Sequence, residues 1–175
     1  MENVIKQLNQ FKTDAIYEKK KHYNAAERKR KYYKWLSIIQ IVLNAITGTT
    51  LITVVFGEGN KIGEVVALIL AIAATVLASV LKIGDFEKQA QGNAKAGDLY
   101  LKISKRISLI LNFIKDKSLS DQEIKEKAEE IHNEIIQANE IGTQFPTNQK
   151  DYNKARAGIK NGEEQYTDEE LQLWE

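Results

Sequence analysis

The chain has 175 residues, of which 28% are charged, and its net charge of +1 and mean hydropathy of −0.39 are ordinary values for a soluble protein. It contains no cysteine, which excludes disulfide bonds and thiolate metal sites. These averages hide two charge-free apolar segments, residues 35–56 and 65–81, inside a very polar chain. Charge is also segregated: residues 1–34 carry ten basic and four acidic side chains, whereas residues 118–175 carry six basic and fourteen acidic ones.

Residues 1–34 are predicted to form an amphipathic helix. Val4, Leu8, Phe11 and Ala15 recur at steps of four, three and four residues, which places them on one helical face. Nothing up to residue 34 breaks a helix, so we expect it to continue into the first apolar segment. The expected membrane anchors lie beside the apolar segments: Arg28, Lys29, Arg30, Lys31, Lys34, Trp35 and Lys82.

This basic cluster would also attract anionic lipid head groups. Because it adjoins an apolar segment, nucleic-acid binding is the less favoured alternative. The cluster and the basic residues 82–117 flank both outer ends of the apolar pair, so we expect both termini to be cytoplasmic. Because 34 polar residues come first, we expect no cleavable signal peptide.

The two apolar segments predict a helical hairpin that crosses a membrane over residues 35–83. A helix rises 1.5 Å per residue, so residues 35–56 would span roughly 33 Å, close to the roughly 30 Å hydrocarbon core of a bilayer. The second segment reaches a similar length over residues 62–83 if Glu64 lies at the interface. The connector, residues 57–63, is rich in glycine, but no strand precedes it, so a tight turn is favoured over a phosphate-binding loop.

The first segment carries a polar arc, defined as Ser37, Gln40, Asn44, Thr47 and Gly48, which fall within about 100° of one another at 100° per residue. Amide groups in lipid need a partner or water. Two interpretations remain open: the arc lines a pore, or it packs against a neighbouring helix, with Gly48 permitting a close approach. A two-helix protomer encloses no water path, so a pore would require several copies in a ring.

The second segment carries a face of small residues that predicts close helix packing: Ala67, Ala71, Ala74, Thr75 and Ala78. Glu64 begins this segment. It is a candidate for an acidic ring at a pore mouth, and the simpler alternative is a solvated carboxylate near a helix N-terminus.

Two further helices are expected over residues 84–146, as a cytosolic antiparallel hairpin. Ser120 and Glu123 form a capping-box signature before a heptad-like apolar stripe that could instead pair between subunits. This heptad stripe consists of Ile124, Ala128, Ile131, Ile135 and Ala138. Residues 147–175 form a polar, acidic tail, in which Thr167 and Glu170 suggest a second, weaker cap. The predicted fold class is therefore all-α, with the divisions 1–34, 35–83, 84–146 and 147–175.

Known catalytic signatures are not found in the sequence. The two histidines, His22 and His132, lie in separate segments, and we interpret both as solvated helix surface. We therefore expect neither enzymatic activity nor a cofactor or metal.

Several short stretches match one family in their order and spacing. They are Tyr17-Glu18, His22-Tyr23 with Ala25-Ala26, Trp35, residues 42–49, and Asn93 with Ala96, Gly97, Tyr100 and Ile103. Over roughly residues 17–146 the chain resembles the SLATT-domain family, two-transmembrane effectors of bacterial nucleotide-dependent conflict systems. Asn93 stands where that family often has histidine.

The resemblance implies an effector of the bacterial inner membrane that oligomerises and forms or opens a pore in anti-phage defence. It also implies a nucleotide-producing or nucleotide-sensing partner protein. The alternative function is a membrane-anchored scaffold that recruits a soluble partner through the heptad helix. A third interpretation is a soluble four-helix protein with buried central helices.

Overall fold

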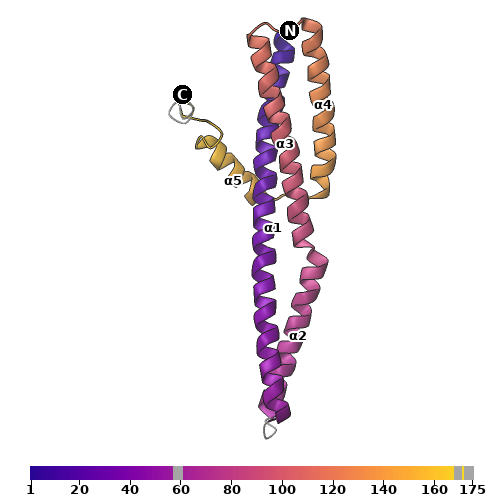
Figure 1. The fold of residues 1–175 in the computed structure, drawn as a ribbon, viewed down its shortest axis with the longest axis vertical. Helices are drawn as coiled ribbons and strands as arrows, with labels where there is room; N and C mark the ends of the chain where they lie inside the picture. Colours follow the sequence, from indigo (N-terminus) through magenta and orange to yellow (C-terminus); the bar gives the residue numbers. More distant parts are fainter. Residues whose placement is uncertain (57–60, 168–170, 172–175) are drawn as a thin grey trace. The chain divides into compact units, whose positions relative to one another are not determined.

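The computed structural model describes residues 1–56, 61–167 and 171, and of residues 53–56 only the backbone. The described residues form five α-helices: α1 (Glu2–Phe56), α2 (Lys61–Gly84), α3 (Phe86–Lys115), α4 (Asp121–Gln144) and α5 (Gln149–Lys160) (Figure 1). Strands do not occur among the described residues, which confirms the predicted all-α class.

The chain forms two compact units. Unit 1 consists of Met1–Glu27 with Ala90–Glu175, and unit 2 consists of Arg28–Gln89. Helices α1 and α3 each contribute to both units. Segments from the two ends of the chain therefore fold together in unit 1.

Helix α1 is continuous over 55 residues, as predicted, and at 1.5 Å per residue it is about 80 Å long. A seven-residue repeat of buried side chains follows its first half: Leu8, Ala15, His22 and Lys29 are 0%, 2%, 3% and 5% exposed. The buried face thus continues beyond the predicted apolar stripe, but its next two positions are occupied by the polar side chains of His22 and Lys29.

In unit 1 the first part of α1 lies beside α3 and α4 (Figure 1). The shared core comprises Leu8, Ala15, Tyr100, Ile103, Ile107, Ile110, Ile131 and Ala138. Helices α3 and α4 form the predicted antiparallel hairpin, and Arg106 of α3 pairs with both Glu130 and Glu134 of α4. This packing buries the heptad stripe of α4, since Ile131 and Ala138 are 0% and 1% exposed.

Local chemistry sets the start of α4. Lys117 has a left-handed φ of 53°, and Ser118 N–H donates to the Phe113 carbonyl at 2.9 Å, which ends α3. The predicted capping box is confirmed: Ser120 Oγ accepts from Glu123 N–H, and the Glu123 carboxylate accepts from Ser120 N–H at 2.7 Å.

The prediction of an acidic tail after residue 146 missed α5. Asn148 and Asp151 form a second capping box, with Asp151 N–H donating to Asn148 Oδ1 at 3.0 Å and Asn148 N–H donating to Asp151 Oδ2 at 2.9 Å. The second predicted cap depends on Glu170, which lies outside the described residues.

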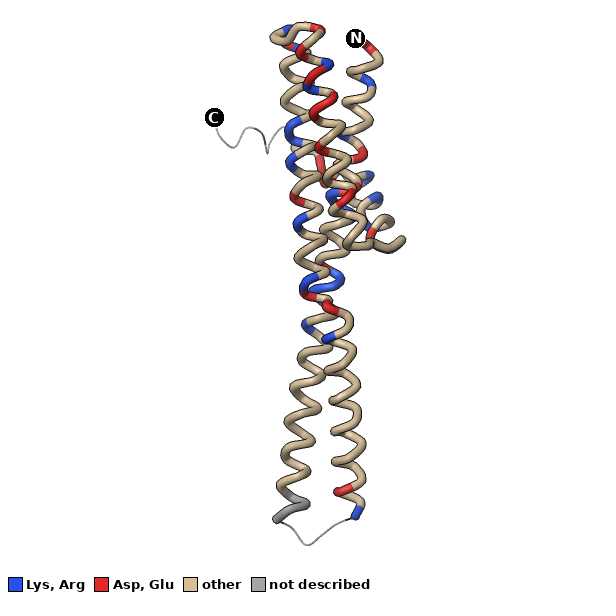
Figure 2. Tube along the Cα trace, turned by 90° about the vertical axis from the view of Figure 1, so that its right-hand side faces the viewer, with Lys and Arg blue, Asp and Glu red and all other residues tan. Residues whose placement is uncertain are grey.

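Unit 2 is a helical hairpin formed by the second part of α1 and by α2. Figure 2 shows that the charged residues of these helices lie near their ends, with a long uncharged stretch between. The turn from α2 into α3 is made by Asp85, whose φ is 40°, and the Gln89 side chain donates to the freed Gly84 carbonyl at 2.8 Å.

Candidate functional site: the membrane hairpin and a buried polar cluster

Both helices of the hairpin expose their apolar side chains. In the most apolar windows of the two candidate spans, only 6% and 11% of residues are buried. Ile41, Ile52 and Leu68, for example, are 67%, 61% and 61% exposed. A soluble four-helix protein would bury these helices, so that interpretation is wrong. Apolar surface of this extent requires lipid or another protein around it.

The alanine face of α2 is its buried side. Ala67 and Ala74, seven residues apart, are 3% and 8% exposed, while Ala71 and Ala78 are half-buried and Thr75 is exposed. Because α2 runs beside the second part of α1 in Figures 1 and 2, these alanines lie along that helix. Small side chains let the two backbones approach closely, so dispersion stabilises the contact.

The polar arc of α1 does not share one environment. Thr47 is 9% exposed and faces into the hairpin, whereas Ser37 and Gln40 are half-buried. Asn44 and Gly48 are exposed, and a Cβ added at Gly48 would meet nothing within 4 Å. The edge of the arc that carries Asn44 and Gly48 is therefore open in the protomer.

Hydroxyl and amide side chains in the spans differ in their hydrogen bonding. Each of five hydroxyl side chains donates to the carbonyl four residues earlier, at 2.8–2.9 Å: Thr47, Thr49, Thr50, Thr75 and Ser79. Among the described residues, the Gln40 and Asn44 amides have no hydrogen-bond partner. In a hydrocarbon environment these amides therefore need partners that the single protomer does not supply.

The predicted membrane anchors are mostly accessible. Arg30, Lys31, Lys34 and Lys82 are exposed, and Trp35 is 64% exposed. At the other end of α2, Glu64 is exposed as well.

Two of the anchors depart from this pattern. The Arg28 guanidinium lies 5.9 Å from the centre of the Tyr32 ring, in a cation–π contact, and the Tyr32 ring meets Phe86 edge-on at 6.4 Å. Lys29 is only 5% exposed, and this burial does not fit a lipid anchor.

A buried polar cluster occupies unit 1, centred on His22, and it overturns the prediction that this histidine is solvated. His22 is 3% exposed and stacks on Tyr100 with ring centres 5.7 Å apart. The Asn93 amide, 0% exposed, donates to His22 Nδ1 at 2.9 Å and to the Phe145 carbonyl at 2.7 Å. Tyr100 O–H donates to Asn139 Oδ1 at 2.7 Å. His132, in contrast, is exposed as predicted.

Geometry assigns the histidine tautomer. Because the Asn93 nitrogen donates, Nδ1 of His22 accepts and the ring proton resides on Nε2, 3.8 Å from a Glu18 carboxylate oxygen. The cluster thus joins α1, α3 and the segment after α4 through directional bonds that fix their register. No group of three His, Asp or Glu side chains in the described part of the chain is arranged to hold a metal ion.

Two tyrosines near the cluster have a raised pKa. Burial, reinforced by the negative charge of Glu18, raises the pKa of Tyr100 to about 12. Burial also raises the pKa of Tyr23, and its hydrogen bond to Asp98, at 2.6 Å, adds to the effect. Both side chains are therefore neutral hydrogen-bond donors at physiological pH.

Comparison with known proteins assigns the chain to a family. The sequence model of SMODS and SLOG-associating 2TM effector domain family 4 matches residues 4–170. The chain belongs to this family. No curated protein and no solved structure matches the chain significantly.

Membership in this two-transmembrane effector family, together with the two exposed apolar helices, identifies the chain as a membrane protein and an effector of conflict systems. The family description also associates such effectors with SMODS and SLOG proteins. The expectation drawn from the sequence resemblance is confirmed at this level.

Of the residues that carried the resemblance, Trp35 and residues 42–49 belong to the hairpin of unit 2, and the others belong to unit 1. His22, Asn93 and Tyr100 form the polar cluster, although sequence reasoning assigned them no role. Their signal was the heptad position of His22, seven residues after Ala15 on the buried face of α1. Sequence reasoning also missed two ion pairs between the tail and α1, Lys19 with Glu164 and Lys20 with Glu163. The partners are far apart in the chain, so no local sequence pattern indicates these pairs.

Proposed function

We propose that this effector assembles through its membrane hairpin and forms or opens a pore. The observation that carries the proposal is that the Gln40 and Asn44 amides have no partner among the described residues, whereas five hydroxyls of the spans bond to carbonyls of their own helix. Asn44 lies nine residues after Trp35, about 13 Å along the helix and so close to mid-bilayer. A polar group at that depth requires a protein or water partner.

A second copy of the hairpin supplies such a partner. Gly48 lies one turn after Asn44 on the same exposed edge, so a neighbouring helix can approach α1 closely there. Repetition of this contact around a symmetry axis produces a closed ring, and amides directed toward the axis would line a water path. Glu64 is exposed at the start of α2 and would add a ring of carboxylates at one mouth.

The proposed setting is the bacterial inner membrane with both termini in the cytoplasm, because the basic residues flank the outer ends of the hairpin. The proposal assigns no enzymatic step to this chain. In the proposal, a nucleotide-producing or nucleotide-sensing protein supplies the trigger. To open the pore, the trigger must bind the open assembly more tightly than the closed one.

Leakage of dye from liposomes tests the proposal. Asn44→Leu replaces the amide by an apolar group of nearly the same shape, so we expect it to abolish leakage caused by the purified protein. Thr49→Val is the matched control, because Thr49 is exposed on the same helix and its hydroxyl already donates to Ala45 at 2.9 Å. Equal leakage from wild type and Asn44→Leu would contradict a pore lined by this arc.

A membrane-anchored scaffold is the second candidate function, and one feature favours it. An apolar groove of about 390 Å³ lies between α1 and α4, bordered by Val4, Phe11, Ala128 and His132. The heptad stripe first considered for partner binding is buried against α1 and α3, so a partner would have to use this groove instead. A scaffold tolerates Asn44→Leu, whereas a pore does not.

A further inference from the structure

The chain after α5 turns back onto α1 because of one glycine. Gly162 adopts a φ of 85°, its N–H donates to the Ile159 carbonyl at 3.2 Å, and Glu163 N–H donates to the Gly158 carbonyl at 3.1 Å. This pair of bonds is a Schellman motif, in which a left-handed residue reverses the chain direction at a helix end. We call residues 161–167 the C-terminal turn.

The C-terminal turn presents two carboxylates to two lysines of α1. Glu164 accepts from Lys19 Nζ at 2.6 Å and lies 3.6 Å from Lys20 Nζ, and Glu163 pairs with Lys20. The side chains of Lys19 and Lys20 are only 10% and 14% exposed. Ammonium groups this deeply placed are costly without an anion beside them, so this position requires negative charge.

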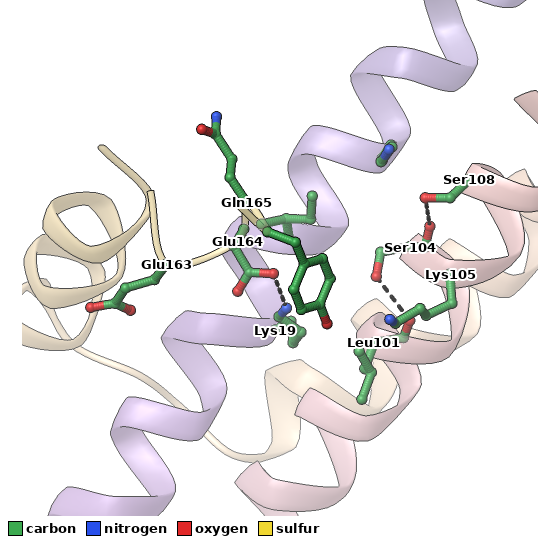
Figure 3. Close-up of a pocket in the computed structure, with 11 residues that line it drawn as sticks. Lys19, Leu101, Ser104, Lys105, Ser108, Glu163, Glu164 and Gln165 are labelled. Atoms are coloured by element: carbon green, nitrogen blue, oxygen red, sulfur yellow. Dashed lines mark hydrogen bonds and ion pairs between the residues drawn. The ribbon is translucent and has the colours of Figure 1, made fainter. Parts of the chain in front are cut away.

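Beside the Lys19–Glu164 pair lies a cavity of about 230 Å³, between α1, α3 and the C-terminal turn. We call it the basic groove. Its walls carry Lys12 and Lys19 from α1, and Ser104, Lys105 and Ser108 from α3. In Figure 3, Glu164 extends toward Lys19, whereas Glu163 points away from it.

The groove has more positive charge than the turn neutralises. Within the described residues, Lys12 and Lys105 form no ion pair. Glu163 also lines the groove, but its carboxylate pairs with Lys20, which is not a lining residue. The hydroxyls of Ser104 and Ser108 are additional donors, once they rotate away from the helix carbonyls that they now bond at 2.8 and 2.9 Å. The cavity is smaller than the about 300–1,000 Å³ of sites that enclose a drug-sized ligand, so it suits a phosphoryl group rather than a whole large molecule.

We propose that the basic groove is a binding site for a phosphate-bearing anion and that Glu164, with Glu163, is a built-in competitor that occupies it. Phosphate oxygens would replace the Glu164 carboxylate on Lys19 and add contacts to Lys12 and Lys105, so binding of the anion releases the C-terminal turn. This proposal concerns binding and release of the turn only, and it holds whether or not the hairpin conducts.

Binding of inorganic pyrophosphate to the full chain in phosphatidylcholine nanodiscs tests the site. If the turn is displaced only about a tenth of the time, the double variant Glu163→Gln/Glu164→Gln binds pyrophosphate about tenfold more tightly than wild type. Adding Lys19→Gln to the double variant weakens its binding of pyrophosphate at least about tenfold. Two controls match these changes: Glu126→Gln/Glu129→Gln on exposed α4 positions, and Lys154→Gln, whose ammonium pairs with Glu27.

Release of the turn is measured separately. The chain has no cysteine, so Gln165→Cys provides a single site for a fluorescent label. The label should gain rotational freedom on addition of pyrophosphate but not of potassium chloride at equal ionic strength. Release in nanodiscs that contain phosphatidylglycerol, without pyrophosphate, would identify a lipid headgroup as the source of the phosphate.

Three results would overturn the proposal. One is pyrophosphate affinity that is unchanged by Lys19→Gln, and another is equal affinity of the wild type and the double variant. The third is a label that responds to potassium chloride as strongly as to pyrophosphate, which would show ordinary screening of surface charge.

Discussion

Replacement of Asn93 by alanine removes one amide that donates to one buried and one part-buried acceptor. The amide donates to His22 Nδ1 and to the Phe145 carbonyl, and Asn93 is 0% exposed. A buried acceptor left without its donor costs about 1–3 kcal/mol. Because water entering the space left by the side chain partly satisfies the two acceptors, we expect unit 1 to lose about 2–4 kcal/mol.

For a unit of roughly 110 residues, about 1 kcal/mol corresponds to a change of about 4 °C in Tm. Asn93→Ala should therefore lower the Tm of unit 1 by about 8–16 °C, measured by far-ultraviolet circular dichroism of the full chain in detergent. Asn133→Ala is the control, since Asn133 is exposed on α4 and the same substitution there removes no buried bond. Indistinguishable Tm values for the two variants would refute the hydrogen-bonded cluster.

Three other predictions concern stability and ionisation in unit 1. Gly92→Ala should destabilise it by about 1–3 kcal/mol in chemical denaturation, because the added methyl group would overlap the Phe145 ring. Hydrogen bonds from Ser120 hold the pKa of Glu123 below its ordinary value, so the cap stabilises α4 above the unfolded-chain pKa of about 4.3 and loses this effect as pH falls through the folded-state pKa; in an NMR titration, Ser120→Ala should raise the pKa of Glu123. The pKa of Tyr100 is raised to about 12, so its contribution to the free energy of unfolding is complete below the unfolded-chain pKa of about 10 and is lost as pH rises toward about 12. The stability of Tyr100→Phe, measured by unfolding at different pH values, should lack this loss.

Each of these predictions has a control or a contrary outcome. Gln91→Ala, on the exposed side of α3 next to Gly92, should leave stability nearly unchanged. A Glu123 pKa that does not respond to Ser120→Ala would mean that the capping box is not formed in solution. Parallel losses of stability above pH 10 in wild type and Tyr100→Phe would assign the effect to other groups.

Periodicity and capping chemistry predicted most of the helices. The steps of Val4, Leu8, Phe11 and Ala15 predicted the buried face of α1, and the Ser120 signature predicted where α4 begins. These signals are local, since a helix face or a cap is determined by residues within one or two turns. The tail contained an equally local signal, Asn148 with Asp151, and it was overlooked because the segment was interpreted from its polarity alone.

Partners distant in sequence could not be predicted in the same way. His22 occupies a heptad position, but only the fold reveals that Asn93 lies opposite it and satisfies its ring nitrogen. The contact between Lys19 and Glu164 joins residues 145 positions apart, and no pattern in one sequence encodes that pairing. For the polar arc, the 100° geometry placed Thr47 and Asn44 together, whereas packing of α2 buries Thr47 and leaves Asn44 open.

Disulfide cross-linking in membranes tests most directly whether copies of the hairpin assemble through the Asn44–Gly48 edge of α1. Single cysteines can be introduced at Gly48 and, as the control, at Ile46, because the chain has no cysteine of its own and Ile46 is 47% exposed about 160° away around the helix. We predict that Gly48→Cys forms covalent dimers on mild oxidation and that Ile46→Cys stays monomeric. Equal cross-linking at both positions, or cross-linking at Ile46 alone, would contradict assembly through this edge.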